Sequence, residues 1–324
     1  MQFGAVVIGR NEGERLKRCL TSLSLASRSL LVYVDSGSTD GSAQWAREHG
    51  VAVVDLDMRM LFTAARARNA GFHELRLIAP SVRYVQFIDG DCELLPGWVE
   101  QATNFLDEHA DVSAVAGRLR ERYPERSIYN WLCEREWDRP AGDVPACGGI
   151  AMMRVDAVAA VGGFREDLIA GEEPELCLRL RSKGWRIWRL GIDMALHDAA
   201  MTHFSQWWKR AMRAGYASAN GAHLHGGRPE RYQVWEARRA LLWGMFIPIA
   251  CVGISILVWP WGLAAWLIYA LQLFRQTVRN RGQLRERFLL ALFQVLARFP
   301  EALGQVKFMR DRIFRFRSAL IEYK

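Results

Sequence analysis

The first 200 residues alternate between short runs of strand-forming residues and longer segments with helical periodicity. The predicted strands cover residues 5–8, 30–34, 51–54, 84–88 and 112–116, and the predicted helices cover about 15–20, 39–49, 64–77 and 97–109. Such alternation is typical of an α/β fold, in which crossover helices cover both faces of a parallel sheet. We therefore expect a mostly parallel central sheet with flanking helices.

Polar clusters follow three of these strands directly. They are RNEGE after the first strand, DSGSTDGS after the second and DGD after the fourth. Ligands bind open α/β sheets at the carboxyl ends of the strands, so we expect these clusters to form one site. The chain has no G-x-G-x-x-G after the first strand and no G-x-x-x-x-G-K-[ST] anywhere, which argues against dinucleotide-binding and P-loop folds.

The DGD cluster places two carboxylates, Asp89 and Asp91, two positions apart. In an extended segment they face the same side, and Gly90 leaves room for a ligand to approach the backbone. Exposed carboxylates at a sheet edge suit Mg²⁺ or Mn²⁺, which would stabilise a diphosphate leaving group. A solvated turn has the same composition, so the residues alone leave both interpretations open.

Two further acidic positions also have a functional and a structural interpretation. Asp35, at the end of the second strand, could accept a hydrogen bond from a nucleotide base. The residues that follow it could form an N-capping turn with Ser38 or Asp40 as the cap, and both interpretations can hold. Glu172, Glu173 and Glu175 open a predicted helix, where acidic side chains also interact favourably with the helix dipole.

Six segments, in order over residues 5 to about 215, resemble inverting glycosyltransferases of family 2, which have the GT-A nucleotide-sugar transferase fold. The segments are VVIGRNEGERLKRCLTSL, VYVDSGSTDGS, ARARNAGF, VQFIDGDCELLPGWV, CGGIAMMRVDAVAAVGGFRE and GEEPELCLRLRSKGWRI.

This resemblance implies roles for individual residues toward the sugar donor. Asp35 would contact the base, Arg68 the nucleotide, and Asp89 and Asp91 the ribose and the metal-bound diphosphate. Asn11, Glu12 and Gly149 complete the expected donor-binding residues, with Gly149 at the junction of donor and acceptor. Some members of this fold place a histidine on the metal after the base helix, so His197 is a candidate ligand.

The resemblance also implies a catalytic base. Family members usually carry Glu-Asp where this chain has Glu172-Glu173, with the aspartate as base. Glu173 would therefore be the base, with a side chain one methylene longer, and Glu172 would orient it or hold the acceptor.

Residues 240–274 form a run of 35 residues without a charged side chain. One membrane span needs roughly 20 residues, and Pro260 interrupts the run. Arginines flank both ends, which favours a transmembrane hairpin that enters and leaves on the cytoplasmic side. A re-entrant or buried core hairpin is the alternative. We expect a catalytic domain at 1–220, a linker or pre-membrane helix at 221–239, the hairpin at 240–274 and basic amphipathic helices at 275–324.

The basic charge is concentrated in the C-terminal segment. The net charge is +8, and residues 275–324 alone carry 12 Lys/Arg against 4 Asp/Glu. Because an apolar run adjoins this segment, membrane lipid is a better expected partner than nucleic acid. The six cysteines form no C-x-x-C pair, and the chain begins with the strand-like FGAVVIG instead of a charged leader. We expect a reduced catalytic domain facing the cytoplasm at the inner membrane.

The expected function is metal-dependent, inverting transfer from a UDP- or GDP-sugar in cell-surface glycan synthesis. The acceptor would be a polyprenyl-linked intermediate or a polysaccharide, and the oligomeric state is open. A sugar nucleotidyltransferase and a non-catalytic membrane scaffold with a degenerate transferase domain are the alternatives. The Glu172-Glu173 pair argues against the first, and the intact carboxylates Asp89, Asp91 and Glu173 argue against the second.

Overall fold

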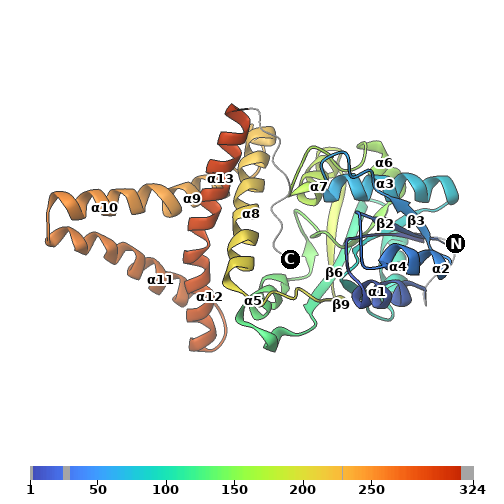
Figure 1. Ribbon diagram of the computed structural model, residues 1–324, viewed down its shortest axis with the longest axis horizontal. Coiled ribbons are helices and arrows are strands. Elements are labelled where there is room, and N and C mark those ends of the chain that lie inside the picture. The colour runs from blue at the N-terminus through green and yellow to red at the C-terminus, as the bar shows by residue number, and fades with distance from the viewer. Residues whose placement is uncertain (1–2, 25–29, 228, 315–324) are drawn as a thin grey trace. The chain divides into compact units, whose positions relative to one another are not determined.

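The computed structural model describes residues 3–24, 30–227 and 229–314 (Figure 1). The chain divides into two compact units, Met1–Thr202 and His203–Lys324. The boundary between the units precedes the long helix α8 (Phe204–His225), most of which the sequence-based division placed in the catalytic domain. The physical reason is that α8 packs along another helix of the second unit, α13 (Arg298–Ile313).

The N-terminal unit is built on a nine-stranded sheet with the order β3-β2-β1-β4-β8-β6-β9-β5, and β7 pairs with β9. The strands are β1 (Phe3–Gly9), β2 (Leu31–Asp35), β3 (Ala52–Asp55), β4 (Tyr84–Asp89), β5 (Cys92–Leu94), β6 (Val112–Glu121), β7 (Gly142–Asp143), β8 (Ala151–Arg154) and β9 (Arg186–His197).

The predicted α/β fold is confirmed, and all five predicted strands form. Strands β3, β2, β1 and β4 pair in parallel, as expected. The other half is mixed, because β8 runs antiparallel to both β4 and β6, and β5 and β7 run antiparallel to β9. Three of the unpredicted strands have four residues or fewer, too short for a periodicity to be recognised.

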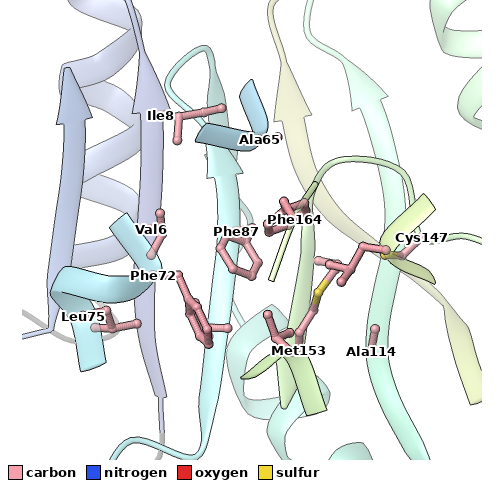
Figure 2. Close-up of a cluster of buried hydrophobic side chains, with 14 of the residues drawn as sticks. Val6, Ile8, Ala65, Phe72, Leu75, Phe87, Ala114, Cys147, Met153 and Phe164 are labelled. Carbon is pink, nitrogen blue, oxygen red and sulfur yellow. The ribbon is translucent and has the colours of Figure 1, made fainter. Parts of the chain in front are cut away.

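Alternate side chains of the strands enter two hydrophobic cores on opposite faces of the sheet. On β1, Val6 and Ile8 face one core while Ala5 and Val7 face the other. The first core, shown in Figure 2, is covered by α3 (Ala64–Ile78), α6 (Val155–Ala160) and α7 (Glu172–Ser182). The second core is covered by α1 (Glu14–Ser24), α2 (Ser42–Glu48) and α4 (Trp98–Glu108). A further helix, α5 (Ile128–Trp137), follows β6 in the chain. Burial on both faces explains why the central strands are mostly apolar.

The C-terminal unit is helical. Helices α8 and α13 lie side by side (Figure 1), and glycines let their backbones approach closely. A Cβ at Gly215 would lie 2.0 Å from the carbonyl oxygen of Glu301, and one at Gly304 would lie 2.0 Å from that of Met212. No side chain fits at either position without moving a helix.

The uncharged run forms a helical hairpin within this unit. Helix α9 (Val234–Leu241) continues through a π-helical turn into α10 (Ile247–Leu257), and the chain returns through a 3₁₀ segment and α11 (Leu267–Arg279) before α12 (Leu284–Leu296). By length and composition, Val234–Leu257 could cross a membrane, and an 18-residue window within it has a mean hydropathy of 2.2. Apolar side chains of the hairpin are exposed, Leu257 at 83 % and Trp261 at 81 %. Its insertion into a membrane stays a prediction.

Candidate active site

Hydrogen bonds connect the loops after β1 and β2 at the carboxyl edge of the sheet. Asn11 adopts a left-handed backbone conformation with φ of 54°. Its N–H donates to Ser38 Oγ at 2.9 Å, and its Oδ1 accepts from the N–H of Thr39 at 2.7 Å. Glu12 lies against Gly90, whose Cβ, if present, would be 3.2 Å from Glu12 Cγ, and its carboxylate pairs with Arg15 at 2.8 Å. Asn11 and Glu12 therefore lie at the strand ends, as expected.

Asp35 is buried and forms the turn after β2. Its Oδ1 accepts from the Tyr33 hydroxyl at 2.9 Å, and its Oδ2 accepts from the N–H groups of Gly37 and Ser38 at 3.0 and 2.9 Å. Burial raises the pKa of Tyr33, which keeps its hydroxyl protonated as a donor. The turn before α2 therefore forms as expected, but its N-cap is Gly41 and neither Ser38 nor Asp40, although Asp40 Oδ1 accepts from the N–H of Ser42 at 3.0 Å. The contact of Asp35 with a base stays a prediction.

Arg68 joins two carboxylates that are far apart in the sequence. The guanidinium donates to Asp89 Oδ1 at 2.8 Å and to Glu172 Oε1 at 2.6 Å, and its side chain is 4 % exposed. Gly149, with φ of 57°, lies beside it, because a Cβ there would be 3.8 Å from an Arg68 nitrogen. The end of β4 and the start of α7 are thus both bonded to the buried guanidinium of Arg68. Glu172 contacts Arg68 in this arrangement, and the expected contact of Arg68 with a nucleotide stays a prediction.

Asp91 differs from the expectation of an exposed carboxylate, since its side chain is 2 % exposed. The reason is the pairing of β5 with β9, which places His197 opposite Cys92. His197 Nε2 lies 3.4 Å from Asp91 Oδ2, and His197 Nδ1 lies 3.6 Å from Oε2 of the buried Glu121. Sequence reasoning missed Glu121, because only the β6–β9 register brings it beside His197.

The residues of this cluster fit a hard divalent cation. Asp91, Cys92 and His197 each offer a ligand atom within 4.8 Å of the others. Burial raises the pKa of the Cys92 thiol well above its usual value, and the thiol donates to Asp91 Oδ1 at 3.4 Å. With the Cys92 thiol donating to Asp91, the Asp91 carboxylate and the His197 imidazole form a donor set that suits Mg²⁺ or Mn²⁺. Glu121 would orient the imidazole from behind, as carboxylates do at metal-binding histidines.

Glu173 points into the domain beneath the loop that precedes β8. Its Oε1 accepts from the N–H of Cys147 at 2.8 Å and from the thiols of Cys147 and Cys177 at 2.9 and 3.0 Å. Its Oε2 is buried and has no hydrogen-bond partner among the described residues. The hydrogen bond with Cys177, together with burial, raises the pKa of the Cys147 thiol well above its usual value, so this donor is protonated. Nothing in the sequence marked Cys147 as a partner of Glu173.

The third acid of α7 has a different role. Glu175 is 1 % exposed, and both of its oxygens accept from Arg179, at 2.8 to 3.0 Å. The three acids at the start of α7 thus have three different partners, Arg68 for Glu172, Cys147 and Cys177 for Glu173, and Arg179 for Glu175.

The fold is that of GT-A glycosyltransferases. The structure superimposes on the mannosyltransferase PcManGT of Pyrobaculum calidifontis with a TM-score of 0.62 and 18 % identity, covering 93 % of this chain and 87 % of that chain. In sequence, residues 5–161 match the family model described as glycosyl transferase family 2.

Two curated relatives agree with this match. Glycosyltransferase AglE of Haloferax volcanii is 24 % identical over 228 residues, which are 66 % of this chain and 72 % of AglE. The pre-mycofactocin glycosyltransferase of Mycobacterium tuberculosis is 30 % identical over 237 residues, which are 68 % of this chain and only 47 % of that protein. Residues 5–161 therefore carry a family 2 glycosyltransferase domain, and the matches together support a glycosyltransferase.

Proposed function

We propose that this glycosyltransferase moves a sugar from a nucleotide-diphospho-sugar to an acceptor with inversion at the anomeric carbon, and that it requires Mg²⁺ or Mn²⁺. The observation that carries the proposal is the position of Arg68, which donates to both Asp89 and Glu172. This contact joins the strand end that would hold the donor diphosphate to the helix that would supply the base.

The donor site would lie at the carboxyl ends of β1, β2 and β4. Asp35, Asn11 and Glu12 line the nucleotide side, and Asp89 faces the ribose and diphosphate. Asp91, Asp89 and His197 would hold the divalent cation, which when bound stabilises the negative charge that develops on the leaving diphosphate. PcManGT is described in complex with GDP-Man and Mn²⁺, which supports a donor of this class. UDP and GDP both offer base N–H donors to Asp35, so that contact does not choose between them.

Glu173 is the proposed general base. Inversion requires a carboxylate that accepts the acceptor's proton while the acceptor oxygen attacks opposite the leaving diphosphate. Three donors hold Oε1 of Glu173 in place, so its unpartnered Oε2 is the oxygen available for the proton. Gly148 and Gly149 follow Cys147 directly and have positive φ, so the loop that contacts the base is also the loop beside Arg68.

The acceptor is proposed to be a polyprenyl-linked intermediate or a surface polysaccharide, used at the cytoplasmic face of the inner membrane. The exposed apolar hairpin supports this choice, because a bilayer would cover side chains such as Ile256, which is 74 % exposed. Arginines before and after the hairpin, Arg238, Arg239, Arg275 and Arg279, would remain at the anionic cytoplasmic surface.

The proposal is tested with the full chain purified in detergent. It is incubated with a panel of UDP- and GDP-sugars, Mg²⁺ or Mn²⁺, and either polyprenyl phosphate or polysaccharide acceptors. We expect one donor to yield a nucleoside diphosphate and a product whose anomeric configuration, read by NMR, is opposite to that of the donor. Retained configuration would overturn the inverting mechanism. Release of inorganic diphosphate would identify a nucleotidyltransferase instead.

A further inference from the structure

Three side chains form a buried thiol–carboxylate cluster, Cys147, Glu173 and Cys177. They are 4 %, 3 % and 0 % exposed. Glu173 and Cys177 lie four residues apart on α7 and so face the same side of the helix. Cys147 comes from the loop before β8, and Figure 2 shows it at the edge of the core. The cluster therefore brings two thiols and one carboxylate from separate parts of the chain to one point.

The spacing of the three ligand atoms is close to that of a tetrahedral metal site. The two sulfurs are 3.6 Å apart, and Glu173 Oε1 is 2.9 Å from one sulfur and 3.0 Å from the other. With Zn–S near 2.3 Å and Zn–O near 2.0–2.2 Å, tetrahedral geometry separates the sulfurs by about 3.7 Å and each sulfur from the oxygen by about 3.5 Å. The sulfurs already fit, and the carboxylate needs to retreat by only about half an ångström.

A second observation also points to a ligand. Glu173 Oε2 is buried without a hydrogen-bond partner among the described residues, which is costly for a carboxylate, and an ion bound through both oxygens of this carboxylate would give Oε2 a partner. From these observations we infer that Cys147, Glu173 and Cys177 form a binding site for a borderline-soft divalent cation, Zn²⁺ in particular, that inhibits the enzyme.

The ligand chemistry separates this site from the one at Asp91. Thiolates favour Zn²⁺, whereas the carboxylates of Asp89 and Asp91 with His197 favour Mg²⁺ or Mn²⁺. Binding releases the two thiol protons, so two thiolates, one carboxylate and a divalent ion leave one net negative charge. Arg189 is 7 % exposed, and the negative charge of Glu173 acts on its guanidinium. The positive charge of Arg189 would offset the net negative charge of the occupied site.

Inhibition follows from the identity of the third ligand, and this step alone rests on the proposed function. A Zn²⁺ ion on the Glu173 carboxylate takes up the group that would accept the acceptor's proton. The ion would also link the loop before β8 to α7, and so fix the loop that carries Gly148 and Gly149.

Binding is tested with Co²⁺, whose thiolate complexes absorb strongly in the near ultraviolet. The full chain in detergent, reduced with a phosphine and freed of metal, is titrated with CoCl₂ and then with ZnCl₂. We expect a thiolate-to-cobalt band that Zn²⁺ abolishes, and the loss of that band in Cys177→Ser. Cys92→Ser is the matched control, because it removes the thiol beside Asp91 and should keep the band. Should Cys177→Ser not fold, Cys147→Ser carries the same test.

Absence of the band in the wild-type protein, or its survival in a folded Cys177→Ser or Cys147→Ser variant, overturns the site. The activity arm measures the Zn²⁺ concentration that halves the rate in excess Mn²⁺, each variant being compared with its own zinc-free rate. We expect this concentration to rise at least tenfold in Cys177→Ser. An unchanged value there overturns the inhibitory role. A cobalt band in a protein without transferase activity would instead refute the proposed function and leave the metal site standing.

Discussion

Replacing Glu173 by glutamine tests the assignment of the catalytic base. The carbonyl oxygen of a glutamine can occupy the position of Oε1 and still accept from the N–H of Cys147, which lies 2.8 Å away. The amide nitrogen then takes the place of Oε2, where the described residues offer no partner. The variant therefore keeps the shape of the site and loses only the charge and basicity of the carboxylate.

The expected loss of rate is far larger than the loss of stability. A hydrogen bond to a charged acceptor contributes about 1 kcal/mol more than one to a neutral acceptor, so we expect the free energy of unfolding to fall by about 1 kcal/mol. General-base catalysis contributes about 10²–10⁴ in rate, which corresponds to about 2.7–5.4 kcal/mol in the activation barrier. We expect kcat to fall by this factor while the Kd of the nucleotide-sugar changes little.

Glu175→Gln is the matched control, because it removes a buried charge from the same helix. Loss of the charged hydrogen bonds to Arg179 should lower the free energy of unfolding by about 2 kcal/mol, with kcat per folded molecule near that of the wild type. The assay measures sugar transfer under donor saturation, with urea unfolding for stability. A Glu173→Gln variant at nearly wild-type rate would refute the reasoning, and so would an equal loss of kcat in Glu175→Gln.

Four further predictions concern the metal site, the helical unit and the membrane. Asp91→Asn should abolish Mn²⁺-dependent nucleotide binding measured by calorimetry, and binding that still depends on Mn²⁺ would contradict the metal assignment. Glu121→Gln should weaken Mn²⁺ binding about 10- to 100-fold, measured by electron paramagnetic resonance, because it changes the group behind His197; wild-type affinity would exclude this role. Gly304→Ala should destabilise the protein by about 1–3 kcal/mol, since its Cβ meets backbone, whereas Gly253→Ala, with nothing within 4 Å, should not; equal melting temperatures would contradict the close helix contact. Topology reporters at residues 235 and 324 should report the same, cytoplasmic side, and opposite sides would mean a single span.

Much of the fold was predictable because it depends on local periodicity. The alternation of apolar runs with helical segments was sufficient to predict five strands, β1–β4 and β6, and four helices, α1–α4. The predicted bounds lie within a few residues of the observed ones. Rules of α/β topology then placed Asn11, Asp35 and Asp89 at the carboxyl ends of parallel strands, where the structure has them. These features need only the order of residues along the chain.

The detailed site depended on contacts that no local pattern encodes. Pairing of β5 and β6 with β9 brings His197 between Asp91 and Glu121, which lie 106 and 76 positions earlier in the sequence. Arg68 on α3 meets Glu172 on α7, 104 positions later, and Cys147 meets Glu173 across 26 positions. The sequence by itself therefore determined which residues lie at the edge of the sheet. Only the tertiary structure decided which of them touch, because strand register and helix packing are set by the whole core.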